Sequence, residues 1–127
     1  MGLNLETVGG STNIKLLWKH PSSGAGFNAQ KVSVDLLGYD AVLVTFRNVS
    51  GVDVIAPAVI APLKQTAALN GYYNDYGINA ACLTTRSFTA DTTGVQFTGG
   101  TIFISTQGAP HADDNVSIPA EIYGVQF

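Results

Sequence analysis

The chain has 127 residues, a length that fits one domain with room for a buried core. Only 12% of the residues are charged, against about 25% in typical soluble domains, and the net charge is −3. The six Lys and Arg residues are scattered, which excludes the concentrated basic patch that nucleic-acid binding needs. No apolar run reaches the roughly 18–20 residues of a membrane-spanning helix. We therefore expect neither nucleic acid nor membrane as a partner.

The predicted elements follow a change of pattern near residue 13. Residues 1–12 have little hydrophobic pattern, and we expect them to be a flexible arm or linker before a single domain of residues 13–127. From there on, apolar and polar residues alternate in short runs bounded by Gly, Pro, Asn, Asp and Ser, which is typical of β-strands. The pattern predicts strands at residues 13–18, 31–36, 41–49, 52–63, 78–89, 95–98, 101–106 and 118–125.

The segments between these runs favour tight connections. Gly38-Tyr39-Asp40 predicts a turn, and residues 107–115 predict a polar loop. Pro57 and Pro62 place the run 52–63 at a sheet edge or a bulge, because proline cannot donate a ladder hydrogen bond. About eight or nine short strands with brief turns predict an all-β fold, an antiparallel, jelly-roll-like β-sandwich.

Residues 16–49 carry a resemblance to a known family. The motifs are Leu17-Trp18, Pro21-Ser22-Ser23, Phe27-Asn28-Ala29-Gln30 and Leu37-Gly38-Tyr39-Asp40. This layout resembles a module of tail-fibre, baseplate and receptor-binding proteins from tailed phages and prophages of Gram-positive hosts. Looser matches follow at Arg86-Ser87-Phe88-Thr89, at Thr93-Gly94-Val95 and in residues 118–125, so that the resemblance covers roughly residues 14–127.

The resemblance implies a β-sandwich located on the virion, often a homotrimer, that touches other virion proteins and the host surface, including its polysaccharide. We therefore expect a tail-fibre or receptor-binding tip module that mediates host attachment. Members of the family usually carry a shaft or anchor before the module, whereas about a dozen residues precede it here. A capsid decoration or head-fibre protein that docks through its N-terminal arm is thus an alternative, and a cell-wall glycan-binding module or hydrolase is a second.

The stretch NGYYNDYG, residues 70–77, is the main candidate binding segment. It holds three of the five tyrosines among turn-forming residues, and tyrosine offers a large contact area at low entropic cost. Three interpretations stay open: the rings lid the core, form a subunit interface, or stack on a receptor sugar. The candidate ligand-binding residues are Tyr72, Tyr73, Asn74, Asp75 and Tyr76.

The sequence offers little support for catalysis. It has no nucleophile-elbow motif and no phosphate-binding glycine motif, and Asp75 with Asp113 or Asp114 is the only carboxylate pair worth testing for glycan hydrolysis. His111, Asp113 and Asp114 form the only cluster of potential metal ligands, but they lack the ligand spacing of an EF-hand or a zinc site, which favours a solvated acidic loop. We expect no enzymatic activity and no cofactor. The single cysteine, Cys82, is predicted to be a small buried apolar residue.

Overall fold

The computed structural model describes residues 2–7, 10–21, 25–49 and 57–127, which form strands and connections only. None of the described elements is a helix of the length and apolarity needed to cross a membrane. The strands are β1 (Gly2–Thr7), β2 (Gly10–Lys19), β3 (Gln30–Ser33), β4 (Ala41–Val49), β5 (Ala58–Pro62), β6 (Thr66–Asp75), β7 (Ala80–Asp91), β8 (Gly94–Phe97), β9 (Thr101–Ile104), β10 (His111–Ala112) and β11 (Val116–Gln126).

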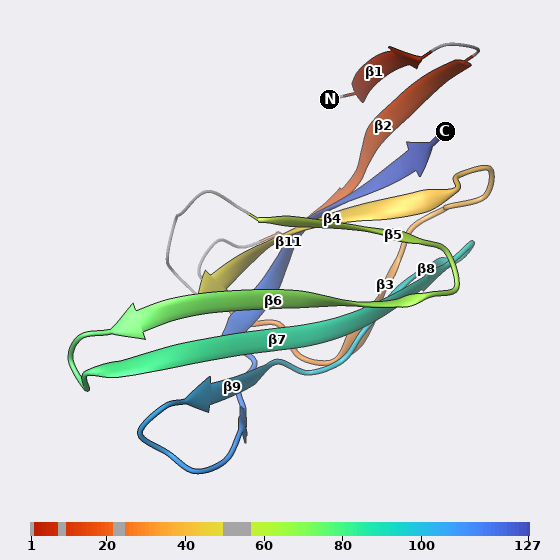
Figure 1. Ribbon diagram of the computed structural model, residues 1–127. Coiled ribbons are helices and arrows are strands. Elements are labelled where there is room, and N and C mark those ends of the chain that lie inside the picture. The colour runs from red at the N-terminus through yellow and green to blue at the C-terminus, as the bar shows by residue number, and fades with distance from the viewer. Residues whose placement is uncertain (1, 8–9, 22–24, 50–56) are drawn as a thin grey trace.

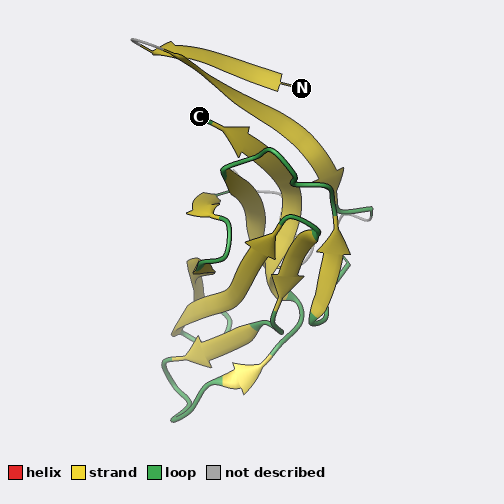
Figure 2. Ribbon diagram, turned by 90° about the vertical axis from the view of Figure 1, so that its right-hand side faces the viewer, coloured by secondary structure: helices red, strands yellow, loops and turns green. Residues whose placement is uncertain are grey.

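The strands form two antiparallel sheets that face each other (Figures 1 and 2). The first sheet has the order β1-β2-β11-β4-β5. In the second sheet β7 is central, and β6 pairs along one of its edges. Along the other edge, β9 pairs with the first part of β7 and β8 with the last part. β10 then pairs with β9, and β3 pairs with β8. The predicted antiparallel β-sandwich is therefore confirmed. The chain crosses between the sheets at β2–β3, β3–β4, β5–β6 and β10–β11, the kind of wrapping found in jelly rolls.

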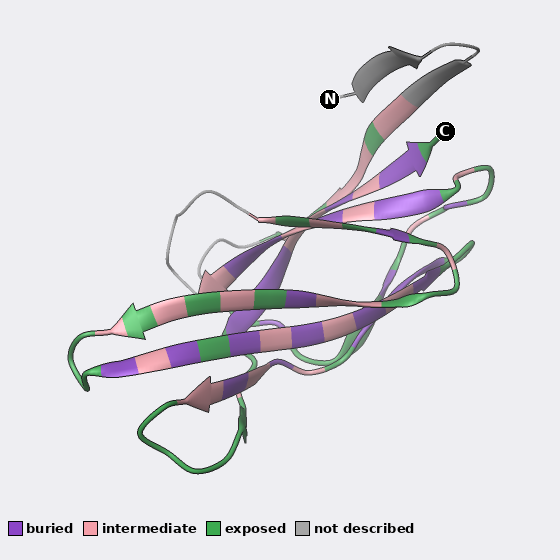
Figure 3. Cartoon of the chain, in the orientation of Figure 1, coloured by how far each residue is buried: buried purple, intermediate pink, exposed green. Residues whose placement is uncertain are grey.

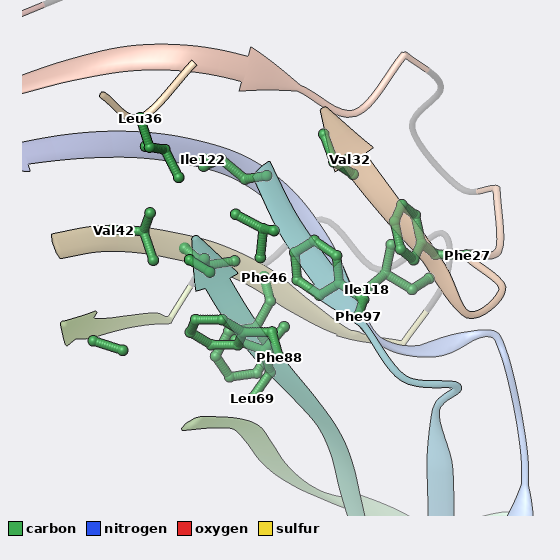
Figure 4. Close-up of a cluster of buried hydrophobic side chains, with 14 residues drawn as sticks. Phe27, Val32, Leu36, Val42, Phe46, Leu69, Phe88, Phe97, Ile118 and Ile122 are labelled. Atoms are coloured by element: carbon green, nitrogen blue, oxygen red, sulfur yellow. The ribbon is translucent and has the colours of Figure 1, made fainter. Parts of the chain in front are cut away.

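The core lies between the two sheets, and alternation produces it. Along β7 the even-numbered side chains are buried and the odd-numbered ones are more exposed (Figure 3). Figure 4 shows the main cluster, to which both sheets contribute. Its largest members include Phe46 and Ile118 from the first sheet and Phe88 and Phe97 from the second. Burying one such side chain stabilises the fold by about 1.5–3 kcal/mol, so this cluster holds the sheets together.

Arg86 fixes the break between β8 and β9. Its side chain is 1% exposed and donates from Nε to the carbonyl oxygen of Ser117 at 2.9 Å and from Nη1 to that of Thr98 at 2.7 Å. The chain passes so close at Gly100 that an added Cβ would lie 2.9 Å from Nη2 of Arg86. A side chain at position 100 would therefore displace the guanidinium from its carbonyl partners.

The charge of Arg86 is held without a carboxylate bond among the described residues. Burial lowers the pKa of Arg86, and the charges of Asp114 and Asp113 partly offset that effect. The guanidinium also lies 5.3 Å from the centre of the Phe27 ring, a favourable cation–π distance. Arg86 is thus a structural clamp between β7, the β8–β9 break and the start of β11.

Several element boundaries differ from the sequence prediction. Residues 2–7 form β1, and β2 begins at Gly10, where no strand was expected. Strand β6 was not predicted at all, and the predicted loop 107–115 contains the short β10. Strand β5 is an edge strand as its prolines indicated, while residues 52–56 of that predicted run lie outside the described part. Cys82 is buried and free, as predicted.

Candidate functional site: the outer face of β6, β7 and β9

The tyrosine-rich stretch is a strand followed by a turn, not the loop that its asparagines and glycines predict. Tyr72 and Tyr73 lie in β6, which pairs with β7 over ten positions. Successive side chains of a strand point to opposite faces, so the two adjacent rings are on opposite sides of the sheet. Tyr76 lies in the turn before β7 and is 86% exposed. The structure therefore separates the three rings into three environments.

Tyr73 faces the interior. It packs against a small second cluster formed by Cys82, Ile102 and Val116. Burial raises the pKa of Tyr73 to about 12, and a hydrogen bond with Cys82 contributes to the same shift. This ring is partly buried and covers one end of the core.

Tyr72 faces outward and is 55% exposed. Its hydroxyl donates to Oδ1 of Asn74 at 2.9 Å, and its backbone carbonyl accepts a bond from Nδ2 of Asn48 at 3.3 Å. Asp75 is occupied locally, since its Oδ1 accepts from the backbone N–H of Gly77 at 3.0 Å. Of the five candidate residues, only Tyr72 and Asn74 thus share an outward face of the sheet.

The strand register extends Tyr72 into a row of apolar side chains across three strands. Tyr72 pairs with Leu83 of β7, and Leu83 pairs with Phe103 of β9. We call Tyr72, Leu83 and Phe103 the outer row. Leu83 is 52% exposed and Phe103 is partly buried. An apolar row on the face of a sheet that points away from the opposing sheet is unusual, because that face is normally polar.

Two polar rows flank the outer row. On one side, Asn70, Thr85 and Thr101 pair across the same three strands, and Thr85 Oγ1 donates to Asn70 Oδ1 at 2.7 Å. On the other side lie Asn74 and Ser105, which are separated by Ala81 of β7. The surface therefore presents an apolar stripe between amide and hydroxyl groups, and none of these side chains is acidic or basic.

A groove of about 260 Å³ lies along this face. Two members of the outer row, Leu83 and Phe103, line it together with the Asn70 row and with Pro110 of the loop after β9. The groove is lined among others by Asn70, Leu83, Thr85, Thr101, Phe103 and Pro110. Tyr72 lies beside the groove, because it is the register partner of Leu83 on the neighbouring strand.

A second hollow, of about 520 Å³, lies at the C-terminal end of β2, beside β3. Trp18, His20 and Phe27 pack there edge to face or tilted, with ring centroids 5.9–6.2 Å apart. Phe27 is buried and belongs to the core, so these rings close one end of the sandwich. Pro21 and Ala25 also line this hollow, and the residues between them, 22–24, lie outside the described part.

The candidate metal and catalytic residues are divided between strand ends and a loop: His111 is in β10, Asp75 ends β6, and Asp113 and Asp114 lie in the loop before β11. His111 is exposed in β10, and Asp113 Oδ1 accepts from the backbone N–H of Asn115 at 2.9 Å. Asp114 is exposed, and its backbone carbonyl accepts from the N–H of Phe27 at 2.8 Å. Within the described residues, no three His, Cys, Asp or Glu side chains come together as metal ligands.

Sequence reasoning did not single out Leu83 or Phe103. Both lie in runs whose strand character was predicted, but the partners of each strand were not. A signal existed in β7, where the outward positions 81–89 read Ala, Leu, Thr, Ser, Thr, so that Leu83 is the one large apolar residue among small polar neighbours. Once β6 and β9 are placed beside β7, the register aligns it with Tyr72 and Phe103.

Comparison with known proteins adds no relative, because no protein-family model, curated protein or solved structure matches the chain.

Proposed function

We propose that the chain is a non-enzymatic structural module of a tailed-phage particle, located in a tail fibre or receptor-binding tip, where it mediates attachment to the host. The resemblance of residues 16–49 to phage tail proteins supports the setting. The outer row supports the activity, and it is the observation that carries the proposal. Two large apolar side chains, Tyr72 and Leu83, each remain more than half exposed on a regular sheet.

Exposed apolar side chains contribute little to folding, and a contiguous exposed apolar group is a mark of a contact surface. The chain is poor in charged residues, so a partner can bind without removing water from charged side chains, which would be costly. Tyrosine suits such a surface because its ring is apolar and its hydroxyl bonds to water or partner groups. Contact, and not chemistry, is the function that this surface supports best.

Locating the chain in intact particles tests the setting. Immunogold electron microscopy of particles from the strain that encodes the chain should place the label at the tail tip. Label on the head, or on no particle at all, would contradict the tail assignment. Adding the purified chain in excess should reduce adsorption of the particles to host cells, whereas undiminished adsorption would contradict the attachment role.

A homotrimer is part of this proposal, with other virion proteins as neighbours. Light scattering at micromolar concentration should give a mass near three times the 13.3 kDa of one chain. A strict monomer at that concentration would count against the trimer.

A capsid decoration or head-fibre protein is the second candidate, and the N-terminal hairpin favours it. Strand β1 pairs with β2 from Gly2↔Lys15 to Thr7↔Gly10, whereas β11 pairs with β2 only from Asn13 onward. The hairpin therefore continues beyond the sandwich (Figure 2). Removing residues 2–12 should abolish incorporation into particles while the sandwich stays folded. Normal incorporation of the shortened chain would exclude docking through this hairpin.

A further inference from the structure

We infer that the outer row and its two flanking polar rows bind an uncharged polysaccharide, with sugar rings stacked on Tyr72, Leu83 and Phe103. This inference rests on the proposed attachment function and names the class of receptor.

The arrangement of the rows matches the chemistry of a pyranose ring. A pyranose presents C–H groups on its face and hydroxyl groups around its edge. Here an apolar stripe meets the face, and Asn70 and Thr85 on one side and Asn74 on the other offer amide and hydroxyl groups to the edge. Neighbouring strands lie about 4.8 Å apart, so the stripe from Tyr72 to Phe103 spans about 10 Å, which accommodates a disaccharide unit.

The absence of charge in these rows selects a neutral ligand. None of the side chains in the three rows is acidic or basic, and the groove lining holds none either. An acidic polysaccharide would lose hydration at its carboxylates or phosphates and meet no cation in return. The rows also contain no carboxylate, so the pair of acids that glycan hydrolysis requires is not part of this surface. The surface therefore holds a glycan without cleaving it.

The extent of the apolar surface argues against a second copy of the chain as the occupant. A stable protein–protein interface buries about 800 Å² on each partner around a well-packed apolar centre. The outer row has three apolar side chains, and Phe103 is already partly buried. Such a stripe is small for a subunit interface, but sufficient for two sugar rings.

Titration followed by NMR tests the inference directly. The isotope-labelled full chain is titrated with four soluble hexasaccharides: cellohexaose, mannohexaose, chitohexaose and, as the charged comparison, hexagalacturonate. We expect at least one neutral hexamer to shift the backbone amide signals of Leu83, Thr85, Thr101 and Phe103, and hexagalacturonate to bind at least tenfold more weakly. No shift of these signals by any neutral hexamer at millimolar concentration would overturn the inference, as would shifts confined to the Trp18 hollow.

A matched pair of variants assigns the binding to the outer row. Leu83→Asp should weaken neutral-glycan binding at least tenfold, because it places a charge in the stripe. Ile60→Asp is the control, since Ile60 is a strand residue of the other sheet with 53% exposure, against 52% for Leu83. Ile60→Asp should bind as the natural chain does. Equal binding by both variants would contradict the assignment, and thermal melts of both check that the fold is intact.

The same pair separates failure of this inference from failure of the proposed function. If Leu83→Asp abolishes competition with particles for host cells but no neutral hexamer binds the chain, the attachment function stands and the polysaccharide is wrong. If Leu83→Asp competes as well as the natural chain, the attachment surface itself is wrong. If Leu83→Asp instead lowers the mass of an oligomer in light scattering, the outer row is a subunit interface, and the glycan inference falls.

Discussion

The two faces of the β6–β7–β9 sheet carry similar side chains with different uses. On the inner face Tyr73, Cys82 and Ile104 pair across the three strands, and on the outer face Tyr72, Leu83 and Phe103 pair one residue along. The inner row packs against Val116 of the opposing sheet. The outer row faces away from it, with Tyr72 and Leu83 more than half exposed.

The comparison shows that composition alone does not decide what an apolar residue does in a sheet. An aromatic or aliphatic side chain that is fully buried between the sheets stabilises the fold by about 1.5–3 kcal/mol. The same side chain on the open face contributes little to folding. Under the proposed function its role there is contact with a partner, so mutations should separate stability from binding along one strand.

The largest expected effect is on the inner face. Phe88→Ala should lower the free energy of unfolding by about 3–5 kcal/mol, because it removes a 1% exposed ring that packs on Phe97 at a centroid distance of 5.9 Å. Leu83→Ala, on the outer face of the same strand, should cost less than about 1 kcal/mol. Denaturant unfolding of the two variants measures the contrast. Similar losses for both would contradict the division between the faces.

Removing the buried cation should have the next largest effect. Arg86→Leu should destabilise the chain by about 2–3 kcal/mol, because the carbonyl groups of Ser117, Val116 and Thr98 lose a charged donor. Amide hydrogen exchange should accelerate at residues 98–100 and 113–117, which the guanidinium holds together. Unchanged exchange there would show that Arg86 does not clamp these segments.

Gly71→Ala should cost about 1–2 kcal/mol. An added Cβ would meet Oδ1 of Asn48 at 2.3 Å and Oγ1 of Thr84 at 2.5 Å, closer than any real contact, so these side chains or β6 would have to shift. Gly77→Ala is the control, because its nearest atom, Oδ1 of Asp75, is 3.3 Å away. Thermal melts should show a clear loss for the first variant and a smaller one for the second.

The last effect is confined to alkaline pH and concerns the pH dependence of stability. The pKa of Tyr73 is about 12 in the folded chain and near 10 in the unfolded chain. The unfolded state therefore releases this proton first, so the contribution is complete below pH 10 and is lost as pH rises towards 12. Tyr73→Phe should reduce the loss of stability between pH 10 and 12, whereas Tyr72→Phe should leave it unchanged. Denaturant unfolding at a series of pH values measures both slopes.

The sequence supports the sandwich because alternation is a local signal. The bounds of β4, residues 41–49, were predicted as found, since Val42, Val44 and Phe46 alternate inward without interruption. The burial of Val32 and Leu36 follows from the same rule, even though β3 ends at Ser33.

The sequence failed where pairing overrides local preference. Asn70-Gly71 and Asn74-Asp75 read as turns, but ten paired positions with β7 hold them in an extended strand. Gly71 is needed there for the close approach of Asn48, not for a turn. The outer row was missed for a related reason, because it exists only through the register of three strands that are not all adjacent along the chain. Of the candidate residues, Tyr72 is the one that sequence reasoning and the outer row share.

The central claim is that the outer row serves contact and not folding, and Leu83→Asp tests it most directly. Unfolding free energy and competition for host cells are measured on the same preparation, with Ile60→Asp in parallel. We predict that both variants unfold within about 1 kcal/mol of the natural chain, since both sites are exposed strand positions, and that only Leu83→Asp loses competition. A Leu83→Asp chain that still competes fully, or that unfolds as readily as a core variant, would contradict the account.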